Sequence, residues 1–278
     1  MTVTRINAYY DQKYNNSSGI DNVQAIFDRW QVDSEKARNT LTCHLDVRYG
    51  AANRETLDLF LATSSSKWLI FVHGGYWRMA TKELFSFIAP PFVQAGYNVA
   101  LVEYDLCPAV TISTITEQCR RGIAWLANHA ADYGSACAEI IIIGHSAGGH
   151  LTAMMFATDW SQYGMSSAKI SGGIAINGLF DLDPITQTAI NADLHLTPQD
   201  VQVLSPIRLE PKVNAPMVVT LGAGESSEFH RQSHLINAAP GWENIATEPV
   251  IVTGYHHFNI LEPFMDLNST MWQPLLQK

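Results

Sequence analysis

Cysteine is scarce in this chain, and no cysteine stands in a metal-binding or redox pattern. The four cysteines, Cys43, Cys107, Cys119 and Cys137, show no C-x-x-C spacing, and a chain of 278 residues can build a core without a disulfide framework. Histidines and acidic residues likewise form no H-E-x-x-H motif and no other clustered ligand spacing. We therefore expect buried or idle free thiols, no metal and no cofactor.

Long apolar runs and basic stretches are also missing. No segment approaches the length of a membrane-spanning helix, and residues 1–7 lack the apolar core of a signal peptide. The formal net charge is -9, whereas a protein that binds nucleic-acid phosphates needs a basic surface. These absences predict a cytoplasmic protein with a small-molecule substrate and no nucleic-acid or membrane partner, and they leave a homodimer open.

Apolar residues are abundant, and strand-like segments alternate with helix-like ones. Hydrophobic residues make up 47% of the chain, which is enough for one large core. The alternation indicates a mostly parallel sheet with helices on both faces, so we predict a single α/β domain over residues 1–278 with an antiparallel pair at its start. The expected strands are 41–49, 56–62, 68–72, 98–104, 140–143, 170–176, 216–221 and 249–253.

Segments of helical period lie between these strands. The expected helices are 21–37, a segment from 81 that Pro90-Pro91 interrupts and Gly96 closes, 111–131, 151–158 and 229–238. Two segments have no clear element. Residues 9–16, within an N-terminal arm and helix that occupy 1–40, fit a flexible leader slightly better than an arm over a site. Residues 178–211 hold two Pro-bounded helical fragments, and we predict a small cap-like insertion over a pocket.

The most informative stretch joins a strand, a sharp turn and a helix at one serine. Four consecutive isoleucines, 140–143, run into Gly144-His145-Ser146-Ala147-Gly148. In a G-x-S-x-G turn between a parallel strand and its helix, the serine hydroxyl is lifted clear of the sheet while the glycines relieve crowding. The helix N-terminus beside the serine favours a developing oxyanion. This context predicts that Ser146 is a nucleophile.

A serine nucleophile needs a base, and this base is usually a histidine oriented by a carboxylate. In α/β hydrolases both follow the serine, on loops after late strands. His256 and His257 occupy the loop after the last expected strand, and position alone does not choose between them.

Several carboxylates could orient that histidine. The candidates are Glu225, Glu228, Asp181 and Asp183. Glu228 directly precedes a helical run, where acidic residues commonly stabilise a helix start. We therefore predict Glu225 as the acid.

A second glycine-rich motif, His73-Gly74-Gly75-Tyr76-Trp77, follows a buried strand. Glycines at such a point let backbone N–H groups turn toward a substrate carbonyl. We predict an oxyanion hole made by the N–H groups of Gly75, Tyr76 and Ala147, with Gly74 as the alternative. His73 is expected to tie down the loop by hydrogen bonding, and Trp77 fits the core and the pocket wall equally well.

These motifs carry a family resemblance over most of the chain. The segment 73–77 resembles the HGGxW signature of the serine-dependent kynurenine formamidases (arylformamidases), a branch of the α/β hydrolases, and 144–151, 225–233 and 257–258 are similar to that family's nucleophile, acid and histidine segments. The resemblance implies an α/β-hydrolase fold with Ser146 as nucleophile. It also implies His257 as base, because the family's histidine is followed directly by Phe, and Glu225 where many members have Asp.

The family's reaction is hydrolysis of N-formyl-L-kynurenine to formate and L-kynurenine in tryptophan breakdown, so the resemblance implies this activity through an acyl-enzyme. We expect substrate contacts from Gly74, Trp77, His145 and Phe258, with Phe180 as a further aromatic near the mouth. Two alternatives stay open: a short-chain carboxylesterase with the same triad, and a ligand-binding module that no longer performs the chemistry.

Overall fold

The order of strands in the sheet follows from the alternation of strands and helices along the chain. The structure is a computed structural model that describes residues 6–276, so residues 1–5 and 277–278 of the predicted domain lie outside the described residues. Its strands are β1 (Cys43–Arg48), β2 (Thr56–Phe60), β3 (Lys67–Val72), β4 (Asn98–Val102), β5 (Glu139–His145), β6 (Ile170–Ile176), β7 (Met217–Gly222) and β8 (Val250–Val252). They form one sheet of order β1-β2-β4-β3-β5-β6-β7-β8. The pairs β1·β2 and β2·β4 are antiparallel and all others parallel, which confirms the predicted α/β-hydrolase fold.

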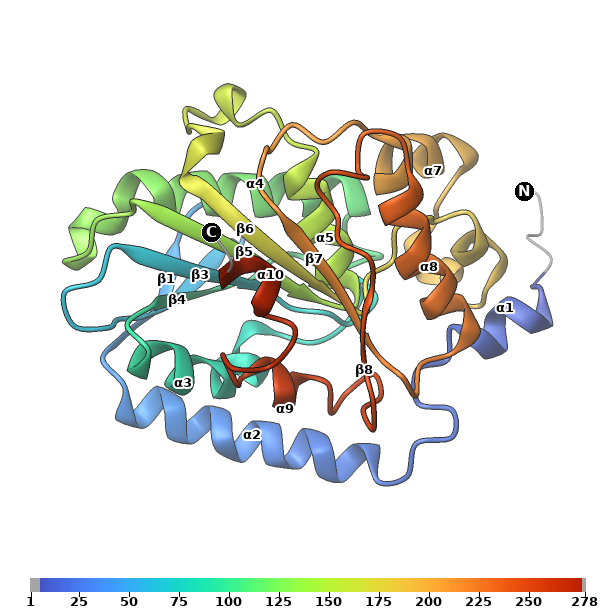
Figure 1. Ribbon diagram of the computed structural model, residues 1–278, viewed down its shortest axis with the longest axis horizontal. Coiled ribbons are helices and arrows are strands. Elements are labelled where there is room, and N and C mark those ends of the chain that lie inside the picture. Colours follow the sequence, from blue (N-terminus) through green and yellow to red (C-terminus); the bar gives the residue numbers. More distant parts are fainter. Residues whose placement is uncertain (1–5, 277–278) are drawn as a thin grey trace.

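Helices cover both faces of this sheet (Figure 1). The α-helices are α1 (Ala8–Lys13), α2 (Val23–Thr40), α3 (Ala89–Gln94), α4 (Ile112–His129), α5 (Ala147–Phe156), α6 (Asn191–Leu194), α7 (Pro198–Leu204), α8 (Ser227–Ala238), α9 (Leu261–Phe264) and α10 (Gln273–Leu276). The 3-10 helices are η1 (Lys82–Ile88), η2 (Ala130–Tyr133), η3 (Trp160–Tyr163), η4 (Ser167–Lys169), η5 (Pro184–Gln187) and η6 (Pro206–Arg208). Helices α2, α3 and α9 lie on one face, and α4, α5 and α8 lie on the other (Figure 1). Within residues 6–276 no helix is both long enough and apolar enough to cross a membrane.

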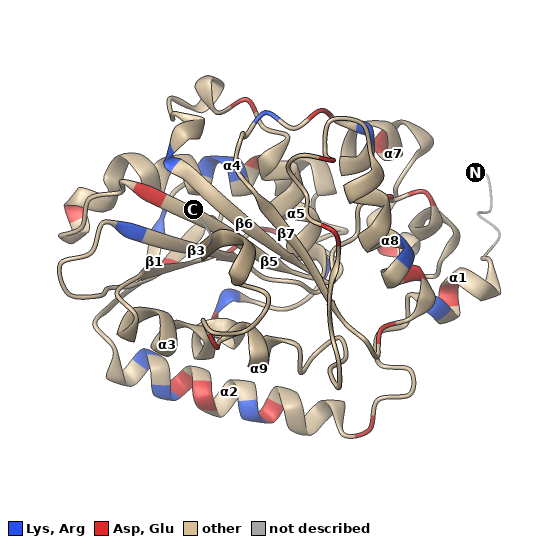
Figure 2. Ribbon diagram, in the orientation of Figure 1, with Lys and Arg blue, Asp and Glu red and all other residues tan. Residues whose placement is uncertain are grey.

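The isoleucine run in β5 shows why both faces need helices. Successive side chains of a strand point to opposite faces of the sheet. Ile140 and Ile142 therefore join the hydrophobic cluster that contains residues of α4 and α5. Ile141 and Ile143 join the other cluster, which contains residues of η1 and α3 and Trp30 of α2. Charged residues lie mainly outside these clusters, and Figure 2 shows acidic and basic residues interspersed along α2.

The segment after residue 81 differs from expectation at its prolines. Pro90 and Pro91 do not interrupt the helical segment, because η1 passes directly into α3 and both prolines stand in the first turn of α3. N–H groups in a first helical turn have no intrahelical acceptor, so proline costs little there. The prolines thus mark the change from 3-10 to α geometry.

The N-terminal segment is folded onto the domain, as an arm, and is not the flexible leader that its composition slightly favoured. The backbone N–H of Asn7 donates to the carbonyl of Gln187 at 2.8 Å, and Asp11 Oδ1 accepts from the N–H of Ala189 at 2.7 Å. Tyr14 is fully buried, and its hydroxyl donates to Glu228 Oε2 at 3.0 Å. Helix α1 is thereby attached to η5 and α8.

The predicted insertion over residues 178–211 is built from short helices. It contains η5, α6, α7 and η6 and no strand, so it holds four short helices where the sequence indicated two Pro-bounded helical fragments. Figure 1 shows it next to α8 and α1.

Candidate active site

The predicted site residues meet at the carboxyl ends of the parallel strands, where α/β sheets commonly bind ligands. The 73–77 loop follows β3 and Ser146 follows β5, and Val72 pairs with Gly144 in the sheet, so the two turns are adjacent. The loop with Glu225 follows β7, and the loop with His257 follows β8.

The backbone of Ser146 is strained in the way that a nucleophile turn requires. Its φ is 59° and its ψ is -118°, and its N–H donates to the carbonyl of Ile176 at 2.8 Å. A Cβ on Gly144 would lie 2.0 Å from the carbonyl oxygen of Gly148, and a Cβ on Gly148 would lie 1.9 Å from that of Val72. Only glycine fits at these two positions, so the strand, the turn and α5 can pack closely enough to present the serine.

Glu225 and His257 form a buried pair. His257 Nδ1 lies 2.7 Å from Glu225 Oε1, and the side chains are 3% and 4% exposed, respectively. The carbonyl of His257 accepts hydrogen bonds from His145 Nε2 at 2.7 Å and from Asn177 Nδ2 at 3.2 Å. Burial, aided by the nearby His257, lowers the pKa of His145 to about 3, so His145 stays neutral and holds the loop. The imidazole ring of His257 is thus held by Glu225, and its backbone carbonyl is held separately by His145 and Asn177.

The neighbouring histidine has a different environment. The N–H of His256 donates to Asn259 Oδ1 at 2.7 Å, and its Nδ1 accepts from the N–H of Phe258 at 3.3 Å. His256 makes no hydrogen bond to a carboxylate within the described part of the chain, so the structure brings His257 and not His256 to an acid.

The alternative acids are engaged elsewhere. Glu228 is buried in the first turn of α8, where it accepts from Tyr14 and pairs with Arg231 Nε at 2.8 Å. Asp181 pairs with Arg231 and Arg208. Asp183 is exposed and precedes η5. Of the four carboxylates considered from the sequence, only Glu225 reaches a histidine of the site.

The glycine loop after β3 packs directly against the nucleophile turn. A Cβ on Gly74 would lie 2.7 Å from the carbonyl oxygen of His145 and 3.0 Å from Ser146 Cβ. The next residues are in the left-handed region, with φ of 109° at Gly75 and 48° at Tyr76. Among residues 6–276, no protein acceptor takes the N–H of Gly75 or Tyr76, nor that of Ala147 at the start of α5. These N–H groups are therefore free to bind a ligand oxygen.

His73 ties this loop to β4, as predicted. Its Nε2 lies 3.0 Å from Glu103 Oε1 and its Nδ1 lies 2.7 Å from the carbonyl of Gly74. Arg54 pairs with the same Glu103 oxygen at 2.7 Å, and the ring of Tyr104 stacks on His73 at 4.2 Å. Burial acts to raise the pKa of Glu103, but His73 and Arg54 outweigh it and the pKa is lowered. A buried carboxylate thus anchors the loop that faces Ser146.

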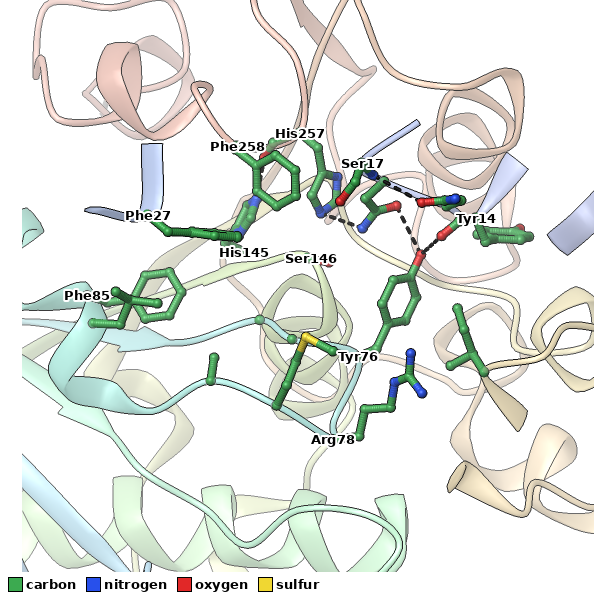
Figure 3. A pocket seen from close by; sticks show the side chains of 18 of the residues that line it. Tyr14, Ser17, Phe27, Tyr76, Arg78, Phe85, His145, Ser146, His257 and Phe258 are labelled. Atoms are coloured by element: carbon green, nitrogen blue, oxygen red, sulfur yellow. Dashed lines mark hydrogen bonds between the residues drawn. The ribbon is translucent and has the colours of Figure 1, made fainter. Parts of the chain in front are cut away.

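A cavity of about 530 Å³ opens over Ser146, a size typical of small-molecule sites (Figure 3). Gly74, His145, His257 and Phe258 line it, as do the aromatic side chains of Phe27, Trp30 and Phe85, and the insertion contributes Ala189 and Ile190.

Two predicted aromatic contacts are absent from the lining of this cavity. Trp77 is fully buried and packs edge-on against His150 with ring centroids 5.0 Å apart. Phe180 is also fully buried. The sequence did not distinguish these core positions from pocket walls, because the turn at Tyr76 directs Trp77 away from the cavity.

The N-terminal arm contributes a residue that sequence reasoning missed. Asn16 Nδ2 donates to His257 Nε2 at 2.8 Å, and Asn16 Oδ1 lies 3.0 Å from the hydroxyl of Tyr76 (Figure 3). A serine nucleophile needs His257 Nε2 as its base, but in this structure Nε2 is bonded to Asn16. The hydroxyl of Ser146 has no hydrogen-bond partner among the described residues. The only signal in the sequence was the polar and aromatic composition of residues 9–16.

Comparison with known proteins finds relatives that match most of the chain. The family model described as BD-FAE matches residues 57–239. The kynurenine formamidase of Salmo salar is 33% identical over 253 residues, which cover 88% of this chain and 84% of that protein. The kynurenine formamidase of Danio rerio is 32% identical over 268 residues, which cover 94% of this chain and 90% of that protein.

Solved structures show the same architecture. A protein from a Silicibacter species that is assigned as a thioesterase has a TM-score of 0.84 at 31% identity, and the match covers 96% of this chain and 98% of that chain. Esterase B of Lactobacillus rhamnosis has a TM-score of 0.67 at 16% identity, with 90% and 91% of the two chains covered. The second likeness shows a shared fold alone.

Proposed function

This chain belongs to the kynurenine formamidase family of α/β hydrolases, and we propose that it hydrolyses an aryl formamide, N-formyl-L-kynurenine, to L-kynurenine and formate. The observation that carries the proposal is the buried pair of His257 and Glu225 at 2.7 Å, because His257 lines the same cavity as Ser146. An imidazole whose Nδ1–H is held by a carboxylate keeps a lone pair on Nε2, and this is the form that accepts a proton once Asn16 no longer bonds to it.

In the proposed reaction, Asn16 first releases His257 Nε2. Ser146 Oγ then attacks the formyl carbon while its proton passes to Nε2. The tetrahedral intermediate collapses as His257 gives this proton to the aryl nitrogen, the C–N bond breaks, and L-kynurenine leaves with formyl-Ser146 remaining. Water attacks the formyl ester as His257 takes one of its protons, and formic acid departs as this proton returns to Ser146. Formic acid then loses its remaining proton to solvent and becomes formate. Glu225 stabilises the imidazolium in both halves.

The oxyanion of each intermediate needs hydrogen-bond donors that are already in position. We assign the N–H groups of Gly75, Tyr76 and Ala147, with Gly74 as the alternative. Support comes from the unpaired N–H groups of the first three and from the contact of Gly74 with the serine turn. One such donor lowers the barrier by about 3 kcal/mol in comparable enzymes.

Turnover of N-formyl-L-kynurenine, followed by the absorbance of L-kynurenine, tests the proposal. The wild type is expected to turn over many times, whereas Ser146→Ala is expected to show no activity above the uncatalysed rate. Hydrolysis that persists in Ser146→Ala would contradict the assigned nucleophile.

Ester hydrolysis is a second candidate, because the structure from Silicibacter at 31% identity is assigned as a thioesterase and acyl transfer from an ester uses the same groups. Comparing kcat/KM for N-formyl-L-kynurenine with that for a p-nitrophenyl ester separates the two. A formamide efficiency lower by orders of magnitude would favour the esterase. Failure of a fluorophosphonate to label Ser146 would instead favour a binding module without chemistry.

A further inference from the structure

One end of the cavity above Ser146 is charged. Of the residues that line this cavity within the described part of the chain, Arg78 is the only lysine or arginine, and Asp11 is the only acid, whose Oδ1 accepts from the N–H of Ala189 at 2.7 Å. In the view of Figure 3 its guanidinium and the phenyl rings of Phe27, Phe85 and Phe258 lie on opposite sides of Ser146. The cavity therefore has an aromatic end and a cationic end, with the nucleophile between them.

The backbone fixes Arg78 relative to the reacting groups. The N–H groups of Arg78 and Met79 both donate to the carbonyl of Gly75 at 3.0 Å, which closes the turn that carries Gly75 and Tyr76. Arg78 thus follows the predicted oxyanion donors on the same tight loop, and a group bound to its guanidinium would be held at a fixed offset from Ser146.

The guanidinium has unused hydrogen-bonding capacity. One nitrogen, Nη1, pairs with Asp193 Oδ2 at 2.5 Å, and the two side chains are 29% and 41% exposed. Arg78 Nε is buried, and no acceptor for it exists among residues 6–276. Arginine offers five N–H donors in a planar fork that suits a carboxylate, and buried donors are normally paired. Nη2 also has no acceptor among residues 6–276, and Arg78 lines the cavity, so its guanidinium is suited to a ligand carboxylate.

We propose that Arg78 binds a carboxylate of the substrate and so selects aryl compounds that carry an acidic side arm. The proposal rests on the proposed function and deepens it. N-formyl-L-kynurenine has its formamide on the aromatic ring and its carboxylate at the end of a side arm, so it matches a site with an aromatic end, a central serine and a cationic end. Asp193 partly neutralises the guanidinium until the substrate arrives.

The test compares a pair of formamides in Arg78→Gln. The pair is N-formyl-L-kynurenine and ortho-formamidoacetophenone, which keeps the aryl formamide and the ketone but lacks the amino-acid arm. We expect KM for N-formyl-L-kynurenine to rise about 10- to 100-fold with kcat little changed, because a charge-assisted contact is lost in ground state and transition state alike. For ortho-formamidoacetophenone, kcat/KM is expected to stay at the wild-type value.

Two further variants separate binding from structure. Arg78→Lys keeps the positive charge without the planar fork, so it is expected to fall between wild type and Arg78→Gln for N-formyl-L-kynurenine. Arg208→Gln is the matched control, because Arg208 is 34% exposed, pairs with Asp181 at 3.6 Å and does not line the cavity. Its kinetics are expected to equal those of the wild type.

Other results would overturn the role of Arg78. An equal loss for both formamides in Arg78→Gln would mean that Arg78 only shapes the loop, and an unchanged KM for N-formyl-L-kynurenine would mean that it binds nothing there. If the wild type cleaves neither formamide, the proposed function fails. The role of Arg78 is then tested by comparing kcat/KM for two esters, phenyl acetate and an aryl acetate that carries a propionate arm. Loss of the preference for the acidic ester in Arg78→Gln supports the role, and an unchanged preference refutes it.

Discussion

Replacing Glu225 by Gln tests how much of the proposed catalysis comes from the charge behind the histidine. The substitution keeps the length and shape of the side chain but removes the negative charge 2.7 Å from His257 Nδ1. The carbonyl of His257 remains held by His145 and Asn177, so the loop should keep its position. The variant therefore isolates the electrostatic contribution of the acid.

The size of the effect follows from burial. Both side chains are nearly inaccessible, so water and salt screen the pair weakly. Unit charges about 4 Å apart attract by about 4 kcal/mol at an effective dielectric constant of ~20, and the imidazolium that forms in each transition state would lose this stabilisation. Since each 1.36 kcal/mol is a factor of ten, kcat should fall about 1,000-fold.

The assay is steady-state turnover of N-formyl-L-kynurenine, or of an ester if that is the better substrate. Glu225→Asp keeps the charge but shortens the arm, so its kcat should lie between those of wild type and Glu225→Gln. Glu228→Gln is the control, because Glu228 is an equally buried acid three residues away that pairs with Tyr14 and Arg231. It should lower stability and leave kcat within a small factor. A Glu225→Gln enzyme with wild-type kcat would refute the assignment of the acid.

Three further predictions use other contacts of the site. His257→Ala should abolish turnover while His256→Ala keeps most of it, and the reverse would show that the base is misassigned. Asn16→Ala should speed the labelling of Ser146 by a fluorophosphonate about fivefold, because it removes a hydrogen bond of about 1 kcal/mol to His257 Nε2. Asn15→Ala is the control. An unchanged labelling rate in Asn16→Ala would show that Asn16 does not compete with the serine for His257. Burial lowers the pKa of His150 to about 4 from 6.5, so the stability that neutral His150 contributes is fully present above pH 6.5 and is lost progressively as the pH falls from 6.5 to about 4. His150→Gln should therefore remove about 2 kcal/mol of the loss in unfolding free energy between pH 7 and pH 5, measured by urea titration, and an unchanged pH dependence would contradict this.

The fold and the serine turn could be predicted from the sequence because their signals are local. The isoleucines at 140–143 indicate a strand buried on both faces, and Gly144 and Gly148 stand where a Cβ would strike backbone. Each signal lies within a few residues of the structure that it causes. The choice of His257 over His256 was different, since the residues alone left it open and only the family resemblance decided it.

The cavity walls could not be predicted in this way. The buried hydroxyl of Tyr14 donates a hydrogen bond to Glu228 and accepts one from Gln232, and both partners lie more than 200 positions further along the chain. Helix α1 is too short to show a hydrophobic period, so no local sequence pattern predicts it. Trp77 was ambiguous for a related reason: its side-chain direction depends on the left-handed backbone at Tyr76 and Trp77, which the residue types do not require.

This division bears on how such enzymes differ in substrate. The segment 57–239, which matches the family model, includes Ser146, Glu225 and the glycine loop, whereas the proposed base His257 lies after it. The arm with Asn16 and the aromatic residues of α2 lie before that segment, and Phe258 lies after it, yet all of them line the cavity. The proposed nucleophile, acid and oxyanion donors therefore lie in the matched segment, whereas the proposed base and most of the aromatic end of the cavity come from chain outside it. Arg78 lies inside the matched segment, on the loop that also carries the predicted oxyanion donors. A change at that one position could alter the charge preference of the site while the acyl-transfer groups stay in place.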